Sequence, residues 1–259
     1  MTKKDRTTDQ SFWDDRWKAR ARERSQFEGH PFYGNGGAFL EMVTREVGGL
    51  KGRTVIELGG GGNNRRLLGL AKWAGATVSA VDFSHEALAT LRRLFLTADT
   101  EVTVFDGDFF ELDFGGRQYD LVTHWGTLEH FADPQALLDL SRRLTQPEGA
   151  VLFGMPNMLG IGSYAWRRWS SAGWSKHILH TDEVIAAACE RAGLELVRCF
   201  YYGRPFLAKD RCESRSPVAL LLAGAQKTAL AAGMVMPSLN RLSSSTFASE
   251  RIFLALPRS

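Results

Sequence analysis

Several signals are scarce in this sequence of 259 residues, and each scarcity excludes a class of protein. The three cysteines, Cys189, Cys199 and Cys212, form no CxxC pair and show no metal-ligand spacing. We therefore expect reduced thiols, a cytoplasmic protein and no bound metal. The N-terminus lacks the apolar run of a secretory signal, so no such leader is expected.

Long hydrophobic runs and a strong net charge are also missing. The most apolar segment, Pro217–Pro237, contains Gln226 and Lys227, which leaves it short of the ~18 uninterrupted apolar residues of a membrane span. The net charge of +3 is too small to indicate a nucleic-acid partner. With 44% hydrophobic and 24% charged residues, the composition predicts a globular protein with a full core.

What the sequence does contain is a regular alternation of strand and helix patterns. The predicted strands are Thr54–Leu58, Thr77–Asp82, Val102–Phe105, Tyr119–His124, Ala150–Met155, Leu194–Tyr201 and Arg251–Leu256. The predicted helices cover about 64–73, 84–96 and 134–144, and a later one begins at Thr181. This alternation predicts a doubly wound, mostly parallel α/β sheet whose first five strands are buried on both faces.

The same pattern divides the chain. Residues 1–49 are expected to form an N-terminal helical arm that closes over a bound ligand, and residues 50–259 a single α/β domain. Within that domain, 157–180 and 203–246 break the alternation. We interpret these two segments as insertions that cap a substrate cleft.

The most informative stretch is "VIELGGGGNN", residues 55–64, directly after the first predicted strand. No Lys-Ser or Lys-Thr follows the glycines, which excludes a phosphate-binding P-loop. A dinucleotide fingerprint requires GxGxxG, but after Gly59 and Gly61 the third position is Asn64. Glu57 beside the loop disfavours a pyrophosphate and favours a ligand with a positive charge.

Further acids and aromatic residues follow the next strands. Asp82 ends the second strand, where a carboxylate can accept both hydroxyls of a ribose. Asp108 follows the third strand and could accept the exocyclic amine of adenine, while Phe83 and Phe109 offer flat apolar faces. Because the carboxyl ends of parallel strands share one edge of the sheet, the sequence predicts a nucleoside site there.

Five motifs in succession, "VIELGGGG", "VDFS", "GDFFEL", "YDLVTHWGTLEHFADP" and "PEGAVLFGMPN", resemble those of class I S-adenosylmethionine-dependent methyltransferases that act on small molecules. The resemblance covers about residues 50–200. It implies a seven-stranded Rossmann-like sheet whose last strand, near 250–256, is antiparallel. It also implies S-adenosyl-L-methionine as cofactor and S-adenosyl-L-homocysteine as product.

The resemblance assigns roles to the residues of these motifs. It places Glu57, Gly59 and Gly61 at the methionine end of the cofactor, Asp82 at the ribose, Asp108 and Phe109 at the adenine, and Trp125 and Gly126 along the methionine and sulfonium. Gly60 and Phe83 complete the expected set of cofactor-binding residues. The sequence departs from the motif at Asn63, where a third glycine is common.

His130, in "TLEHF", is the candidate catalytic residue. It follows the fourth strand near the expected methyl group, and an imidazole can act as a general base or position the acceptor. Oxygen is the favoured acceptor atom if His130 is a base; nitrogen and carbon stay open. His124, inside the same strand, is interpreted as a packed core residue.

The cap segments and the arm would select the acceptor. The predicted substrate-binding residues are Tyr33, Tyr164, Trp166, Arg167 and Trp169. Aromatic and basic side chains favour an aromatic, hydrophobic or anionic small molecule, as in a biosynthetic enzyme, and the apolar helix within 203–246 keeps a lipid-like acceptor open. Nucleic acid is disfavoured, and the chain is expected to be a monomer or a homodimer.

Functions of two other classes are disfavoured by the sequence. An NAD-dependent oxidoreductase is disfavoured by the missing third glycine and by Arg168, which stands four residues after Tyr164 where a lysine would be needed. A methyltransferase fold that only binds, without catalysis, is disfavoured by the intact glycines together with Asp82 and Asp108.

Overall fold

The computed structural model describes residues 6–23, 36–207, 216–236, 238 and 244–258. Its centre is a seven-stranded sheet in the order β3-β2-β1-β4-β5-β7-β6. The strands are β1 (Thr54–Leu58), β2 (Thr77–Asp82), β3 (Thr103–Asp106), β4 (Tyr119–Trp125), β5 (Thr145–Pro156), β6 (Leu194–Pro205) and β7 (Ala248–Pro257). Strand β7 runs antiparallel to both β5 and β6, and the other pairs are parallel. The predicted doubly wound sheet with an antiparallel last strand is confirmed.

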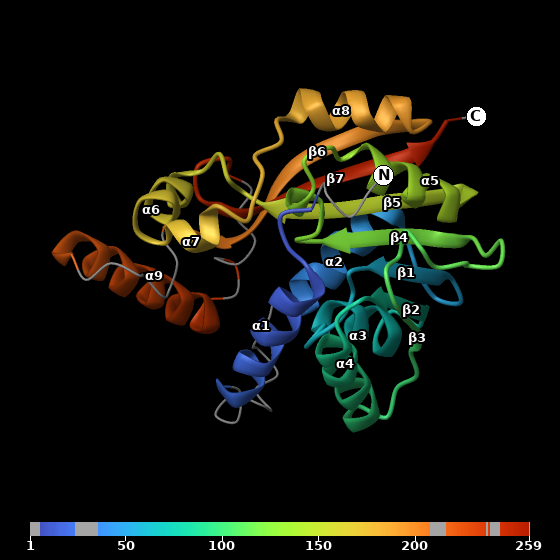
Figure 1. The fold of residues 1–259 in the computed structure, drawn as a ribbon, viewed down its shortest axis with the longest axis horizontal. Helices are drawn as coiled ribbons and strands as arrows, with labels where there is room; N and C mark the ends of the chain where they lie inside the picture. Colours follow the sequence, from blue (N-terminus) through green and yellow to red (C-terminus); the bar gives the residue numbers. More distant parts are fainter. Residues whose placement is uncertain (1–5, 24–35, 208–215, 237, 239–243, 259) are drawn as a thin grey trace.

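Helices cover both faces of this sheet (Figure 1). They are α1 (Gln10–Glu23), α2 (Gly36–Val47), α3 (Arg65–Lys72), α4 (His85–Thr97), α5 (Gln135–Leu144), α6 (Ile161–Trp169), α7 (Ser171–Trp174), α8 (Asp182–Arg191) and α9 (Pro217–Val235), with a short 3-10 helix η3 (Leu128–His130). Helices α5 and α8 lie on one face and α2, α3 and α4 on the other, whereas α6, α7 and α9 extend from one end of the molecule (Figure 1).

Alternating side chains divide the core into two layers. Along β5, Val151 and Phe153 point into the cluster beneath α5 and α8, while Leu152 points into the cluster shared with α2, α3 and α4. Such a strand must be apolar at every position, because successive side chains face opposite sides. The expectation that all of the first five strands are buried is wrong for β3, which is the edge strand and leaves Thr103 and Asp106 exposed.

Capping side chains fix where several helices begin. Ser84 accepts a hydrogen bond from the backbone N–H of Ala87, and Thr181 accepts one from Val184, so that each satisfies an otherwise unpaired donor. Helix α5, which the sequence predicted over about 134–144, begins one residue later, at Gln135. Its backbone N–H donates to Asp133 Oδ1 at 3.0 Å, which forms a turn before the first helical residue.

The arm and the cap segments have different structural roles. Helix α2 packs Phe39, Met42 and Val43 into the core. Of the two described helices of the predicted arm, α1 is therefore the one that covers the domain from outside, against α4. Segment 157–180 contains α6 and α7, and segment 203–246 contains α9, which contacts α6 and β6. The division of the chain at residue 49 stays a prediction.

Candidate active site

A cavity of about 440 Å³ opens at the carboxyl ends of β1, β2 and β4. Its walls bring together many of the residues that the sequence singled out. They are Glu57, Gly59, Gly61, Asp82, Phe83, Phe109, Trp125, Gly126 and His130. Gly60 and Asp108 were predicted at this site as well, but neither lies on the cavity wall.

The glycine loop between β1 and α3 leaves no room for side chains. Gly59 has a φ of +73°, and a Cβ atom on Gly61 would lie 2.6 Å from Asp82 Oδ2. Gly60 sits behind the wall, where a Cβ atom would meet the Glu57 carbonyl oxygen at 2.9 Å. Asn64 closes the loop by accepting from Leu67 N and donating to Gly60 O. Any residue larger than glycine would therefore clash in this loop, and its bare backbone is left facing the cavity.

Two buried acids face this cavity from the first two strands. Burial raises the pKa of the Glu57 carboxyl to about 7 and that of Asp82 to about 6, because desolvation disfavours the charged form. Asp82 accepts from the backbone N–H groups of Gly61 and Ser84. Glu57 Oε2 is buried and has no hydrogen-bond partner among the described residues. An ammonium group in the cavity would satisfy it.

Arg6 occupies the end of the cavity where the resemblance places adenine. Its guanidinium donates to Asp108 Oδ1 at 2.5 Å and lies 5.4 Å and 5.5 Å from the ring centres of Phe83 and Phe109. Asp108 is thus engaged by Arg6, and Phe110 N also donates to it. Nothing in the polar N-terminal sequence singles Arg6 out, since its role appears only when the chain folds back over the sheet.

His130 lies on η3 at the same cavity and is buried. Its Nδ1 is 2.8 Å from the carbonyl oxygen of Lys176, which can only accept, so Nδ1 carries the hydrogen and Nε2 the lone pair. Burial lowers the pKa of the His130 ring to about 4, which keeps the ring neutral at pH 7. Trp13 of α1 packs edge-on against it, with ring centres 5.3 Å apart.

His124 does not line this cavity. It is fully buried in β4 and stacks on Phe153 with ring centres 4.8 Å apart. Desolvation lowers its pKa to about 3. The interpretation of His124 as a packed core residue is confirmed.

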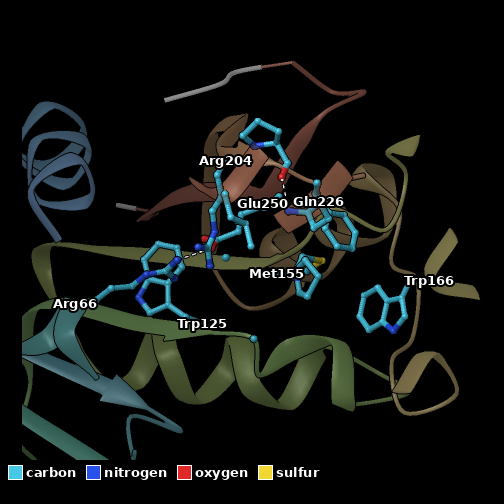
Figure 2. A pocket seen from close by; sticks show the side chains of 14 residues that line it. Arg66, Trp125, Met155, Trp166, Arg204, Gln226 and Glu250 are labelled. Atoms are coloured by element: carbon cyan, nitrogen blue, oxygen red, sulfur yellow. Dashed lines mark hydrogen bonds and ion pairs between the residues drawn. The ribbon is translucent and has the colours of Figure 1, made fainter. Parts of the chain in front are cut away.

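A second cavity of about 370 Å³ adjoins the first (Figure 2). Both cavities are lined by Arg66, Trp125, Gly126 and Pro156. The second cavity is further lined by Gly154, Met155, Trp166, Arg204, Pro205, Phe206, Gln226, Leu230, Ser249 and Glu250. Figure 2 shows Arg66 and Trp125 at one end and Trp166 at the other, with Met155 between them.

Several polar side chains line the second cavity, and some of them are already paired. Arg66 forms an ion pair with Glu250 and lies over the ring of Trp125. Gln226 donates to Pro205 O and accepts from Leu207 N, which joins α9 to the end of β6. The second cavity thus combines apolar walls with charged and polar side chains.

The predicted substrate-binding residues are only partly brought together. Trp166 is buried and lines the second cavity, whereas Tyr164 is 72% exposed. Tyr164, Arg167 and Trp169 lie on neither wall, and Tyr33 is outside the described residues. The sequence reasoning missed Arg66, Arg204, Phe206 and Gln226. Of these, Arg66 had a signal, because it directly follows the glycine loop in the first turn of α3.

Comparison with known proteins places these features in context. Residues 35–198 match a family described as a methyltransferase domain. The chain is 36% identical over 121 residues to the ubiquinone biosynthesis O-methyltransferase of Alkalilimnicola ehrlichii, an alignment that covers 46% of this chain and 47% of that protein. It is 33% identical over 122 residues to the protein of the same name from Salmonella paratyphi A, which covers 47% and 50%. The chain spans about half the length of the curated relatives it matches.

Solved structures show the same architecture. The magnesium protoporphyrin IX methyltransferase of Synechocystis PCC 6803, determined with bound S-adenosylmethionine, superposes with a TM-score of 0.59 over 97% of this chain and 98% of that one. At 16% sequence identity, this similarity shows the fold alone. Within the described ranges, no helix has the length and apolar character needed to cross a membrane, α9 included.

Proposed function

This chain belongs to the family of methyltransferase domains, and from that premise we propose that it transfers a methyl group from S-adenosylmethionine to a hydroxyl oxygen of a small molecule. Family membership confirms the predicted superfamily. The methyl-transfer activity and the cofactor are part of this proposal. The acceptor, the acceptor atom and the roles of individual residues are our proposal. The cytoplasmic location and the oligomeric state stay predictions.

The observation that carries the proposal is the pair of adjoining cavities with Trp125 and Gly126 between them. The first cavity fits the cofactor. Glu57 Oε2, which no described residue hydrogen-bonds, suits an ammonium group. Asp82 suits the ribose, and Phe83 with Phe109 suits the adenine. Gly59 and Gly61 allow the ligand to approach the backbone, while Gly60 supports the loop from behind.

The second cavity supports an apolar, ring-bearing acceptor. Trp166, Phe206 and Leu230 give it flat and aliphatic walls, and Arg204 adds a positive charge to its lining. The relatives named for O-methylation in ubiquinone biosynthesis support a hydroxyl as the acceptor group. Leu230 comes from α9, so a lipid-like tail on the acceptor is the second candidate substrate feature.

The chemistry asks the protein mainly to position its reactants. When bound, the cofactor supplies a methyl group that moves to the acceptor oxygen as the carbon–sulfur bond breaks with its electrons on sulfur. We assign His130, which lines the first cavity together with Trp125 and Gly126, to an acceptor hydroxyl that reaches the junction of the two cavities, where Nε2 can accept its hydrogen bond. Because the pKa of the His130 ring is near 4, the ring is a weak base. His130 therefore orients the acceptor oxygen, and the hydroxyl proton leaves to solvent.

Calorimetric titration with S-adenosylhomocysteine and with NAD tests the cofactor assignment. We expect the first to bind and the second not to. Asp82→Ala should weaken binding of S-adenosylhomocysteine by roughly 1–3 kcal/mol, because the ribose hydroxyls lose a carboxylate. Asp106→Ala is the matched control, since Asp106 ends the adjacent edge strand and pairs with His85 instead. A chain that binds NAD but no S-adenosylhomocysteine would refute the proposal.

Mass spectrometry of acceptor mixtures tests the choice of oxygen. Phenols and the matching anilines, each with and without an alkyl tail, are incubated with S-adenosylmethionine and the chain. We expect a mass gain of one methylene on the phenols, and the tailed pair reports on the lipid-like alternative. Methylation of the anilines alone would overturn the proposed acceptor atom.

A further inference from the structure

Three side chains with metal-binding atoms meet in the wall of the first cavity. One ligand atom each from Glu129, His130 and His177 lies within 4.8 Å of those of the other two. Glu129 and His130 are buried, with exposed fractions of 1% and 6%, and His177 is half-buried. None of the three belongs to the proposed cofactor-binding residues. The sequence predicted no metal, because these residues do not follow a known metal-ligand spacing.

The backbone holds both imidazoles in the tautomer that metal ligation requires. His130 Nδ1 lies 2.8 Å from Lys176 O, and His177 Nδ1 lies 2.7 Å from Gly173 O. A carbonyl oxygen can only accept a hydrogen bond, so both Nδ1 atoms carry the hydrogen and both Nε2 atoms carry the lone pair. A hydrogen bond from the remote ring nitrogen to a carbonyl is the usual support of a metal-bound histidine.

The two segments that supply these ligands are joined to each other. Ile178 N donates to Glu129 O at 2.7 Å, and the Thr7 hydroxyl donates to Lys176 O at 2.6 Å. The ring centres of His130 and His177 are 4.7 Å apart. The side chains are therefore set in place before any ligand arrives, which lowers the ordering cost of binding.

The chemistry of the three groups identifies the class of ion. Two neutral imidazoles with one carboxylate and an open position are a ligand set of catalytic zinc sites. Magnesium is disfavoured, because it prefers oxygen ligands in a regular octahedron. Arg16 also lines the cavity, so the carboxylate of Glu129 has to offset a nearby positive charge.

We propose that Glu129, His130 and His177 bind a divalent cation of the Zn²⁺ class, whose open position takes the acceptor oxygen. The second half of this statement rests on the proposed O-methylation. There the cation would lower the pKa of the acceptor hydroxyl, whose proton leaves to solvent, and the oxygen would then attack the methyl carbon as the carbon–sulfur bond breaks. His130 would position the oxygen through the ion rather than by a direct hydrogen bond.

Titration of the untagged full chain with Co²⁺, followed by visible absorption, tests the site itself. We expect saturation at one equivalent, an absorption band typical of a four-coordinate ion, and loss of the band when Zn²⁺ is added. His177→Gln and Glu129→Gln should each weaken Co²⁺ binding by roughly tenfold or more. His85→Gln is the matched control, because His85 is exposed and pairs with Asp106 elsewhere.

The possible outcomes separate this inference from the proposed function. S-adenosylhomocysteine binding and thermal melting show whether each variant is folded. Absence of saturable Co²⁺ binding, or binding that is equal in all variants, overturns the metal site. Phenol methylation that survives a chelator unchanged in a chain that binds Co²⁺ overturns the role assigned to the ion, while the proposed function stands. Saturable metal binding without methylation of any hydroxyl compound supports the site and refutes the proposed function.

Discussion

At the scale of single residues, Glu57 and Asp82 dominate the electrostatics of the first cavity. Neither acid has a basic side chain within salt-bridge distance among the described residues, and burial raises the pKa of both. A folded-state pKa above the ordinary value means that the native chain holds the proton more tightly than the unfolded chain. The stabilising contribution of Glu57 is therefore largest below its ordinary pKa of 4.5 and is lost as the pH rises to about 7.

Cofactor affinity should follow the opposite course. Because an ammonium group favours the ionised carboxylate, S-adenosylhomocysteine should bind roughly tenfold more tightly at pH 8 than at pH 5.5. Titration calorimetry at the two pH values measures this difference. Glu57→Gln should remove most of the dependence, leaving the smaller part due to Asp82. An affinity that does not change with pH in the unsubstituted chain would contradict the assignment of Glu57 to the ammonium group.

The sequence identifies such residues when a motif carries them. Glu57, Asp82, Phe83 and Phe109 follow parallel strands, and the common edge of a parallel sheet brings strand ends together whatever the rest of the fold. Arg6 could not be found in this way. Its contacts depend on a segment that is far away in sequence and has no pattern of its own.

At the scale of elements, the segment before α1 behaves as part of the site. Arg6 pairs with Phe131 in an isolated β-bridge, and Thr7 N donates to His130 O at 2.9 Å. This short antiparallel contact places Arg6 against Asp108 and the phenylalanine rings. The guanidinium thus occupies the position that the resemblance assigns to adenine.

Arg6→Ala should strengthen binding of S-adenosylhomocysteine by several-fold, because adenine no longer competes with a charge-assisted hydrogen bond of roughly 1.5–3 kcal/mol. Arg6→Lys, which keeps the charge without the planar fork, should lie between the two. Calorimetry of the three proteins measures the order. Weaker binding by Arg6→Ala would mean that Arg6 covers the adenine in the complex instead of competing with it.

Helix α6 shows what element-level prediction leaves open. Composition indicated an aromatic and basic cap, but it did not show which face of the helix turns inward. Ser163 and Trp166, three residues apart, are buried, whereas Tyr164 and Arg167 point away from the core. The face that turns inward is determined by packing against Phe206 of the segment 203–246, whose ring centre lies 6.2 Å from that of Trp166.

At the scale of the whole molecule, the proposed function places the cofactor in the first cavity, at the strand ends, and the acceptor in the second, which the cap segments help to line. Substitutions at the far end of the second cavity should change the acceptor and spare the cofactor. We expect Trp166→Phe to raise the KM of a phenol acceptor several-fold while the Kd of S-adenosylhomocysteine changes less than about twofold. Steady-state kinetics and calorimetry measure the two quantities. Tyr164→Ala, on the exposed side of the same helix, should alter neither.

A result in which Trp166→Phe weakens cofactor binding as much as acceptor binding would show that the cavities are not separate.

The fold itself was predictable from alternation and motifs, including the antiparallel β7. The second cavity was not, because α6, β6, α9 and β7 meet there from segments without a shared sequence signal.

The contact between α1 and the glycine loop constrains how positions 17 and 62 can change together during evolution. A Cβ atom on Gly62 would lie 2.0 Å from the ring of Trp17, and Gly62 also has a φ of +79°. A side chain at position 62 would therefore collide with Trp17, whereas a smaller residue at position 17 creates no such clash. In descendants of this chain, a bulkier residue at position 62 should therefore appear only after position 17 has become small, and the order of those two changes is fixed by sterics.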